Sequence, residues 1–207
     1  RSAMMREVED TRHSLLEPTP CQAEIALGEK EASIRNGNIT AVIRHFDWGM
    51  KSQISFYNQR GDLLLRECDG GGALNVTPRF FKPILGGDHQ LTVSFEGFHE
   101  EKLYGMGQYQ QDQWDIKYCS FELAHRNSQA SVPFVLSSRG YGFLWHNPAI
   151  GRANFARNKT EWHAVSTRQM DYWITAGDTP AQIEEAYAKA TGTVPMMPEY
   201  GLGFWQC

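Results

Sequence analysis

Two carboxylates lie on either side of an aromatic ring in the stretch QQDQWD, where Asp112 and Asp115 flank Trp114. A pair of carboxyl groups beside an aromatic side chain is one arrangement that can hydrolyse a glycosidic bond. The stretch is polar, however, and a spacing of three residues does not fix two carboxyl groups at a catalytic separation. We therefore interpret both as solvated loop charges and assign no catalytic residue to the chain.

Metal and cofactor chemistry finds no support in the residue spacing. The seven histidines are dispersed without HExxH spacing and suffice as surface or hydrogen-bonded residues: His13, His45, His89, His99, His125, His146 and His163. Gly105-Met106-Gly107 follows a predicted strand, but a dinucleotide fingerprint would need a third glycine and a following helix. These glycines are expected to bend a strand or allow close packing. The sequence predicts no metal and no cofactor.

The cysteines and the apolar runs bear on the cellular compartment. Cys21, Cys68, Cys119 and Cys207 are scattered singly, so we interpret them as reduced thiols. No apolar run approaches about 18 residues, and residues 1–16 lack the apolar centre of a signal peptide. We expect no membrane contact and a cytoplasmic location.

The composition is that of a globular protein, with 41% hydrophobic, 12% aromatic and 21% charged residues. The net charge is -4, and the chain has no Lys/Arg block. Nucleic acid is therefore excluded as a partner and a neutral one is favoured.

Short apolar and β-branched runs separated by turn residues dominate the chain from Cys21 onward. Turns are predicted at Asn36-Gly37-Asn38, Arg60-Gly61-Asp62 and Ser138-Arg139-Gly140, and HQLTVSFEGF is a further strand. Repeated short strands indicate a β-sandwich.

One helix is predicted over residues 179–191. Thr179 can cap it, Pro180 occupies its first turn, Gln182 completes a capping box, and Gly192 follows its end. After it, VPMMPEY interrupts regular structure, and GLGFWQC is a short apolar run at the end of the sequence.

Four segments occur in a recognisable order over about half of the chain: LYGMGQ, VPFVLSSRGYGFLWHNP, DYWITAGDTPAQIEEAYAKATG and PEYGLGFWQC. Together they resemble glycoside hydrolase family 31, the α-glucosidases and α-xylosidases. The sequence around HRNSQASVPF and LWHNPAIGRA most resembles the bacterial α-xylosidase-like branch of the family. The first half of the chain resembles the family only loosely.

The resemblance implies a mainly β fold, a galactose-mutarotase-like β-sandwich with one short helix near the C-terminus, followed by a truncated first strand of a (β/α)8 barrel. We expect a leading arm or expression remnant at 1–20, the sandwich at 21–195 and the start of the barrel at 196–207. The family's two catalytic aspartates lie on later barrel strands, so none is carried onto this sequence, and the fragment alone is expected to be inactive.

The polar run His125 to Gln129 precedes an apolar strand, and in the family a sandwich loop at this place reaches toward the sugar site. Amide, hydroxyl and guanidinium groups can hydrogen-bond sugar hydroxyls, although polar residues are also common in plain turns. Of the tryptophans, we expect Trp145 and Trp173 to be core, whereas Trp48 and Trp114 are equally suited to stacking on sugar. The substrate-binding candidates are Arg126, Asn127, Gln129 and Trp114.

Three functions remain open. The first is the supporting region of an enzyme that hydrolyses terminal α-linked glucose or xylose from oligosaccharides. The second is a free-standing carbohydrate-binding module, for which the apolar ending GLGFWQC would be superfluous. The third, a mutarotase-like epimerase, is disfavoured because no His/Glu pair is suggested by position. The partners expected are an α-linked oligosaccharide, the missing barrel and, through the exposed barrel-facing surface, further copies of the chain.

Overall fold

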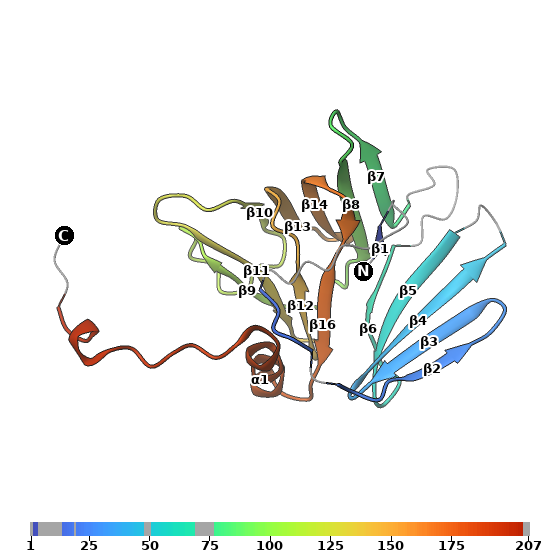
Figure 1. Cartoon of the computed structure of the whole chain (residues 1–207), viewed down its shortest axis with the longest axis horizontal. Coiled ribbons are helices and arrows are strands. Elements are labelled where there is room, and N and C mark those ends of the chain that lie inside the picture. The colour runs from blue at the N-terminus through green and yellow to red at the C-terminus, as the bar shows by residue number, and fades with distance from the viewer. Residues whose placement is uncertain (1, 4–13, 19, 48–50, 69–76, 205–207) are drawn as a thin grey trace.

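The computed structural model describes residues 2–3, 14–18, 20–47, 51–68 and 77–204, and these form a mainly β structure with a single α-helix (Figure 1). Three antiparallel sheets and one two-stranded ribbon account for the strands. The predicted fold class, mainly β with one short helix near the C-terminus, is confirmed. No helix in the described part of the chain has the length and apolar character needed to cross a membrane.

The first of the sheets, here the amino-terminal sheet, is a meander whose strands follow one another in the chain. Its order is β2 (Glu24–Leu27), β3 (Glu31–Asn36), β4 (Ile39–Phe46), β5 (Lys51–Asn58) and β6 (Leu63–Arg66). Asn36 pairs with Ile39 across the predicted turn, where Gly37 has a φ of 58°. Gly61, in the second predicted turn, has a φ of 82°, and both turns are confirmed because such values favour glycine.

The sandwich itself consists of a five-stranded and a four-stranded sheet that face each other. The five-stranded sheet has the order β10 (Ser120–Leu123), β13 (Gly151–Phe155), β14 (Lys159–Thr167), β8 (His89–Glu96) and β7 (Arg79–Pro83). The four-stranded sheet has the order β16 (Tyr172–Ala176), β12 (Tyr141–Trp145), β11 (Ala130–Ser137) and β9 (Leu103–Gln108). Both predicted strands of VPFVLSSRGYGFLWHN are therefore present, as β11 and β12.

The core lies between these two sheets and is rich in aromatic side chains. In β8, Leu91, Val93 and Phe95 are fully buried, which is the alternation expected of a strand with one face on a core. Phe95 of β8 packs edge-on against Phe143 of β12, with ring centroids 5.4 Å apart. Trp145 is fully buried, as predicted, and its ring stacks on Trp162 of the opposite sheet at 6.0 Å. Such burial is the main stabilising contribution to the fold.

The outer face of the four-stranded sheet is covered by α1 (Pro180–Thr191), which confirms the predicted helix. The side chain of Thr179 accepts a hydrogen bond from the Gln182 amide, as the capping prediction requires. The Gln182 side chain, however, accepts from the backbone of Asp178 rather than from the cap residue. Ile183 is buried against β11 and β12, and Tyr187 stacks on Phe134.

The glycines of β9 confirm the structural interpretation of Gly105-Met106-Gly107. Gly105 has a φ of 117° and Gly107 one of 89°, and the register between β9 and β11 shifts beside them. A Cβ atom on Gly107 would lie 2.3 Å from the carbonyl oxygen of Ala130. Only glycine allows the two strands to approach so closely.

The two ends of the chain behave differently. Ser2–Ala3, inside the predicted leading arm, forms β1 and pairs with β15 (Gln169–Met170), and the amide of Leu16 donates to the carbonyl of Ala190 in α1. The segment after the helix extends away from the sheets (Figure 1). It contains a 3-10 turn, η1 (Glu199–Gly201), and none of its described residues pairs in a sheet. The predicted first barrel strand, with Trp205, reaches residues 205–207, which lie outside the described residues.

Candidate functional site

A tight turn carries three of the four predicted sugar-binding residues. It joins β10 to β11, and Arg126 and Gln129 face each other across it through hydrogen bonds between their backbones, Gln129 N to Arg126 O at 3.0 Å and the reverse at 3.4 Å. Ser128 has a φ of 67°, so the chain reverses direction at Asn127 and Ser128. Asn127 is therefore at the exposed tip of the turn, whereas Gln129 is half-buried at its base.

Arg126 is the charged member of this turn. Its guanidinium forms an ion pair with the carboxylate of Glu122, which lies four residues earlier, in β10. Both side chains are more than half exposed, so the pair is solvated and contributes little to stability. The guanidinium has five N–H donors, and a single carboxylate does not use them all. Arg126 can therefore keep its counterion and still donate to a ligand.

A hollow of about 450 Å³ lies beside the turn. Its lining includes Ser14, His125, Val132, His146, Ile150 and Tyr187. The hollow is mostly apolar, and His125 forms part of its rim while accepting a hydrogen bond from the amide of Ser131. An apolar concave surface with a few polar groups at its edge is the usual form of a ligand site.

A histidine and a carboxylate meet at the inner wall of this hollow. Nδ1 of His146 lies 3.2 Å from a carboxylate oxygen of Asp171, and both side chains are buried. The Ser14 amide donates to Nε2 of the same ring at 3.4 Å. This pair was not predicted from the sequence. The pairing of β12 with β16 creates it, because His146 and Asp171 lie just beyond the paired residues Trp145 and Tyr172.

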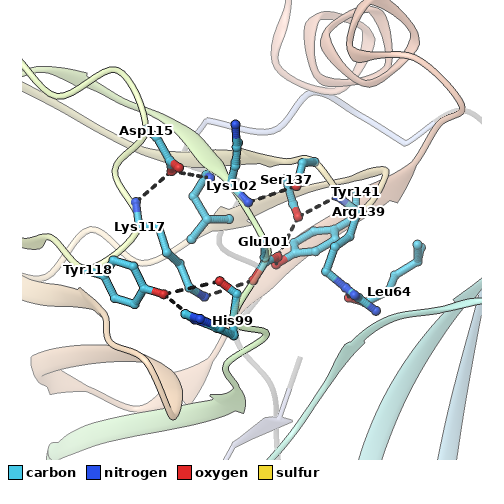
Figure 2. Close-up of polar contacts among 12 residues, drawn as sticks. Leu64, His99, Glu101, Lys102, Asp115, Lys117, Tyr118, Ser137, Arg139 and Tyr141 are labelled. Carbon is cyan, nitrogen blue, oxygen red and sulfur yellow. Dashed lines mark hydrogen bonds and ion pairs between the residues drawn. The ribbon is translucent and has the colours of Figure 1, made fainter.

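Trp114, the fourth candidate, is on a different loop, between β9 and β10. Its side chain is 85% exposed and leans on the ring of Tyr104, with centroids 6.1 Å apart. One carboxylate oxygen of the next residue, Asp115, accepts hydrogen bonds from the amides of Leu103 and Lys117, each at 3.0 Å (Figure 2). Asp115 is therefore an anchor of the loop and not the solvated charge that was predicted, whereas Asp112 is exposed.

A buried polar network fixes the same loop from below (Figure 2). The carboxylate of Glu101 accepts from the hydroxyls of Ser137 at 2.6 Å and Tyr141 at 2.7 Å, and it lies 3.3 Å from Nζ of Lys117. Burial, together with the Glu101 charge, raises the pKa of Tyr141 well above its usual value, so the hydroxyl stays protonated as a donor. Every member has a partner, which makes the network a rigid support.

Tyr109 links the two loops that carry the candidates. Its hydroxyl lies 2.9 Å from the carbonyl oxygen of Glu122, to which it donates, and 2.8 Å from the hydroxyl of Ser131. The ring packs on Phe121 at 4.8 Å. The base of the Trp114 loop is thus tied to both strands that flank the turn at Asn127. Sequence reasoning missed this residue, since a single tyrosine in a polar loop carries no pattern.

The structure therefore brings Arg126, Asn127 and Gln129 into one turn and places Trp114 on a neighbouring, separately anchored loop. Trp48 and Trp205 lie outside the described residues. Trp173, predicted to be core, is only half-buried and contacts Tyr187. Within the described ranges, no group of three or more His, Cys, Asp or Glu side chains could hold a metal ion.

Comparisons with known proteins identify the family. No family model matches the chain. A relative named as an uncharacterized family 31 glucosidase, ORF2 from Pseudescherichia vulneris, is 52% identical over all of this chain, which covers 41% of that protein. Alpha-xylosidase A from Aspergillus niger is 30% identical over 96% of the chain, which covers 27% of it. The chain thus spans less than half the length of these relatives.

Solved structures agree with the sequence relatives. A GH31 alpha-xylosidase from a soil metagenome, solved with xylose, superposes with a TM-score of 0.90 at 46% identity. The match covers 99% of this chain and 32% of that protein. The xylosidase from Aspergillus niger gives a TM-score of 0.75 over 85% of this chain and 25% of its own. The chain belongs to glycoside hydrolase family 31 and corresponds to the amino-terminal, β-rich portion of its members.

Proposed function

We propose that the protein carrying this chain is a retaining α-glycosidase that hydrolyses terminal α-linked xylose or glucose from oligosaccharides. The 207 residues form its non-catalytic amino-terminal region. The observation that carries the proposal is the match of nearly the whole chain to a GH31 alpha-xylosidase at a TM-score of 0.90 and 46% identity. Of the two sugars, xylose is favoured by three relatives that are named alpha-xylosidases. Two of them are 30% and 29% identical to this chain, and the third superposes on it with a TM-score of 0.90.

The chemistry of such an enzyme requires two carboxyl groups about 5 to 5.5 Å apart, one as nucleophile and one as acid and base. We assign neither role, nucleophile or acid and base, to a carboxylate of the described residues. Glu101, Asp115 and Asp171 are each engaged in internal contacts, and Glu67 is fully buried. The family's catalytic aspartates are on barrel strands, and the barrel is the partner that this region would brace.

The turn at Asn127 is the part of the region that we propose to contact the sugar. Asn127 offers an amide with both donors and an acceptor at the tip, Gln129 offers a second amide at the base, and Arg126 offers charged donors. Trp114 offers an exposed ring of the kind that stacks on a sugar face. The Glu101 network and Tyr109 would hold these groups in place before the substrate arrives, which lowers the entropic cost of binding.

The compartment and the assembly state are further parts of the proposal. Cys21, Cys68 and Cys119 are unpaired thiols, which fits the reducing cytoplasm. A neutral oligosaccharide is the expected ligand of a chain with a net charge of only -4. The exposed apolar side chains of the amino-terminal sheet support self-association of the isolated region.

The experiment is steady-state hydrolysis of p-nitrophenyl α-xyloside and α-glucoside by the intact protein and its Asn127→Ala variant. Loss of one hydrogen bond to the sugar corresponds to about 0.5–1.5 kcal/mol, so kcat/KM should fall roughly three- to tenfold. Asn158→Ala, the same change in an exposed turn elsewhere on the sandwich, is the matched control and should leave kcat/KM unchanged.

Two results would contradict the proposal. Equal activity of Asn127→Ala and the wild type would remove this turn from the sugar site while leaving the enzyme assignment intact. An intact protein that binds oligosaccharides but hydrolyses neither glycoside would support the alternative function, a carbohydrate-binding region without catalysis.

A further inference from the structure

A polar trench runs between the tips of the amino-terminal sheet and the helix side of the sandwich. One part, of about 480 Å³, lies between the β3–β4 turn, strand β16 and helix α1. The adjoining part, of about 210 Å³, lies between the β5–β6 turn and the β16–α1 connection. Asn38 and Ala176 line both parts, so the two parts adjoin. The trench shares no lining residue with the hollow beside His125.

One tryptophan that was predicted to be core, Trp173, lines the larger part of the trench. Trp173 is on the outer face of β16, next to the edge of the four-stranded sheet, and is half-buried. One side of its ring meets Tyr187 of α1, with centroids 6.3 Å apart. In the described part of the chain, β16 is the edge strand of its sheet. An aromatic ring that lines a trench is a platform for a flat, partly apolar ligand.

Planar polar side chains form the walls, and internal hydrogen bonds fix them. The Asn38 side-chain oxygen accepts from Gln59 at 2.7 Å, and that of Gln182 accepts from the amide of Asp178 at 2.8 Å. In both side chains the amide oxygen accepts an internal hydrogen bond. The NH₂ group of the same amide has two N–H donors that can bind a ligand. Asn36 at the β3–β4 turn adds a further amide. Side-chain amides of this kind can hydrogen-bond the vicinal hydroxyls of a sugar.

The charges of the trench compensate each other. Arg60 forms an ion pair with Asp178 at 2.7 Å across the smaller part, and Lys189 pairs with Glu185 at 2.7 Å along the larger part. The hydrogen bond from Arg60 to Asp178 raises the pKa of the guanidinium further, so it stays charged at all relevant pH values. A lining with paired charges offers no net attraction to an anion or a cation. It selects for a neutral, hydroxyl-rich ligand.

We propose that this trench is a second glycan-binding site, which holds a distal part of an α-linked oligosaccharide or polysaccharide chain away from the point of hydrolysis. The inference rests on the proposed function for the identity of the glycan. Trp173 stacks on one sugar ring, and Asn36, Asn38 and Gln182 donate to hydroxyls of that ring and its neighbour. The site is open at its surface, as binding to the middle of a chain requires.

The test is affinity electrophoresis of the intact protein through native gels that contain xyloglucan or dextran, with a gel lacking polysaccharide as reference. The wild type should be retarded on at least one of the two. Trp173→Ala should weaken binding roughly tenfold, since loss of a stacked ring corresponds to about that factor. Ala186→Trp, which fills the larger part of the trench without removing any polar group, should abolish retardation.

Glu184→Ala is the matched control, because Glu184 is exposed on α1 but does not line the trench. It should be retarded like the wild type. Circular dichroism of each variant separates loss of binding from loss of fold, and Ala186→Trp keeps the test valid if Trp173→Ala unfolds. Hydrolysis of p-nitrophenyl α-xyloside is measured in parallel as the readout of the proposed function.

The inference is overturned if the wild type is retarded on neither gel, or if Ala186→Trp migrates like the wild type on both. It is also overturned if Asn127→Ala alone abolishes retardation, because binding would then reside at the turn beside the hollow. Retardation that depends on the trench in a protein without glycosidase activity would leave this inference standing and refute the proposed function. The two failures are therefore distinguishable.

Discussion

Glu67 is a carboxylate with no exposed surface at the junction between the amino-terminal sheet and the sandwich. It accepts a hydrogen bond from the amide of Ile54 at 2.8 Å and lies 3.2 Å from Nε of Arg79. Burial raises the pKa of Glu67 to about 7, and the Arg79 charge and the Ile54 amide only partly oppose this. The residue therefore gains its proton on folding at pH values where the unfolded chain has lost it.

This pKa predicts a specific pH dependence of stability. Between about pH 4.5 and 7 the folded state binds more protons at Glu67 than the unfolded state, so stability falls as the pH rises through that window. The difference amounts to about 3 kcal/mol at most. Glu67→Gln, which keeps the shape and the acceptor for Ile54, should remove this decline. Urea unfolding of the wild type and of Glu67→Gln at pH 5 and pH 8 measures this decline. The same change in the free energy of unfolding between the two pH values for both proteins would refute the shifted pKa.

The buried pair of Lys117 and Glu101 leads to a second prediction at the same scale. Their side chains are 2% and 1% exposed. Lys117→Met would leave the Glu101 carboxylate buried without its counterion, and loss of one partner of such a pair costs about 3–5 kcal/mol. The free energy of unfolding should fall by that amount. Lys102→Met, at an exposed neighbouring lysine, is the control, and an equal, small effect of both changes would show that the network contributes no stability.

At the scale of elements, the hairpins and the helix were predictable because local residues specify them. Asn36-Gly37-Asn38 and Arg60-Gly61-Asp62 supply the positive φ values of two turns, and Thr179 and Gly192 mark the two ends of α1. The pairing of Ser2–Ala3 with β15 was not predictable, since it joins residues more than 160 positions apart and depends on the finished sheets.

The candidate site was predictable only in part, for the same reason. The turn at Arg126 to Gln129 is contiguous in sequence, so its residues were found together. The inward orientation of Asp115, the bridge formed by Tyr109 and the contact between His146 and Asp171 arise from contacts between separate elements. No spacing within the sequence signals such contacts, whereas the pairing of β12 with β16 produces the last of them directly.

The docking of α1 on the four-stranded sheet can be tested through one side chain. Ile183 is 1% exposed and is the buried residue of the helix. Ile183→Ala should lower the free energy of unfolding by about 2–4 kcal/mol, because it removes buried methyl groups and leaves a cavity. Glu184→Ala, one position along on the exposed side, should change it by less than about 0.5 kcal/mol. Similar losses for both variants would mean that helix propensity, and not packing, stabilises this element.

At the scale of the whole molecule, the apolar face of the amino-terminal sheet continues from the core to an open edge. Phe56 and Leu65 are buried at one end of this face, whereas Ile25 and Leu27 of the edge strand β2 are 65% and 84% exposed. The described residues place no strand beyond β2. An exposed apolar edge strand of this kind pairs readily with another chain.

The isolated 207-residue chain should therefore self-associate. Leu27→Lys places a charge on the edge strand and should shift the molecules toward monomers in multi-angle light scattering at the same concentration. Ala26→Lys, on the opposite face of the same strand, adds the same single charge and is the control. A wild-type chain that is monomeric at all concentrations would contradict the prediction.

The central claim is that this region supports an α-glycosidase without being catalytic itself. Its most direct test is hydrolysis of p-nitrophenyl α-xyloside and α-glucoside by the 207-residue chain, measured beside the intact protein that carries it. We predict hydrolysis by the intact protein and none by the chain alone. Hydrolysis by the chain alone would contradict the account, and Asp112 and Asp115 would then be the first carboxylates to replace.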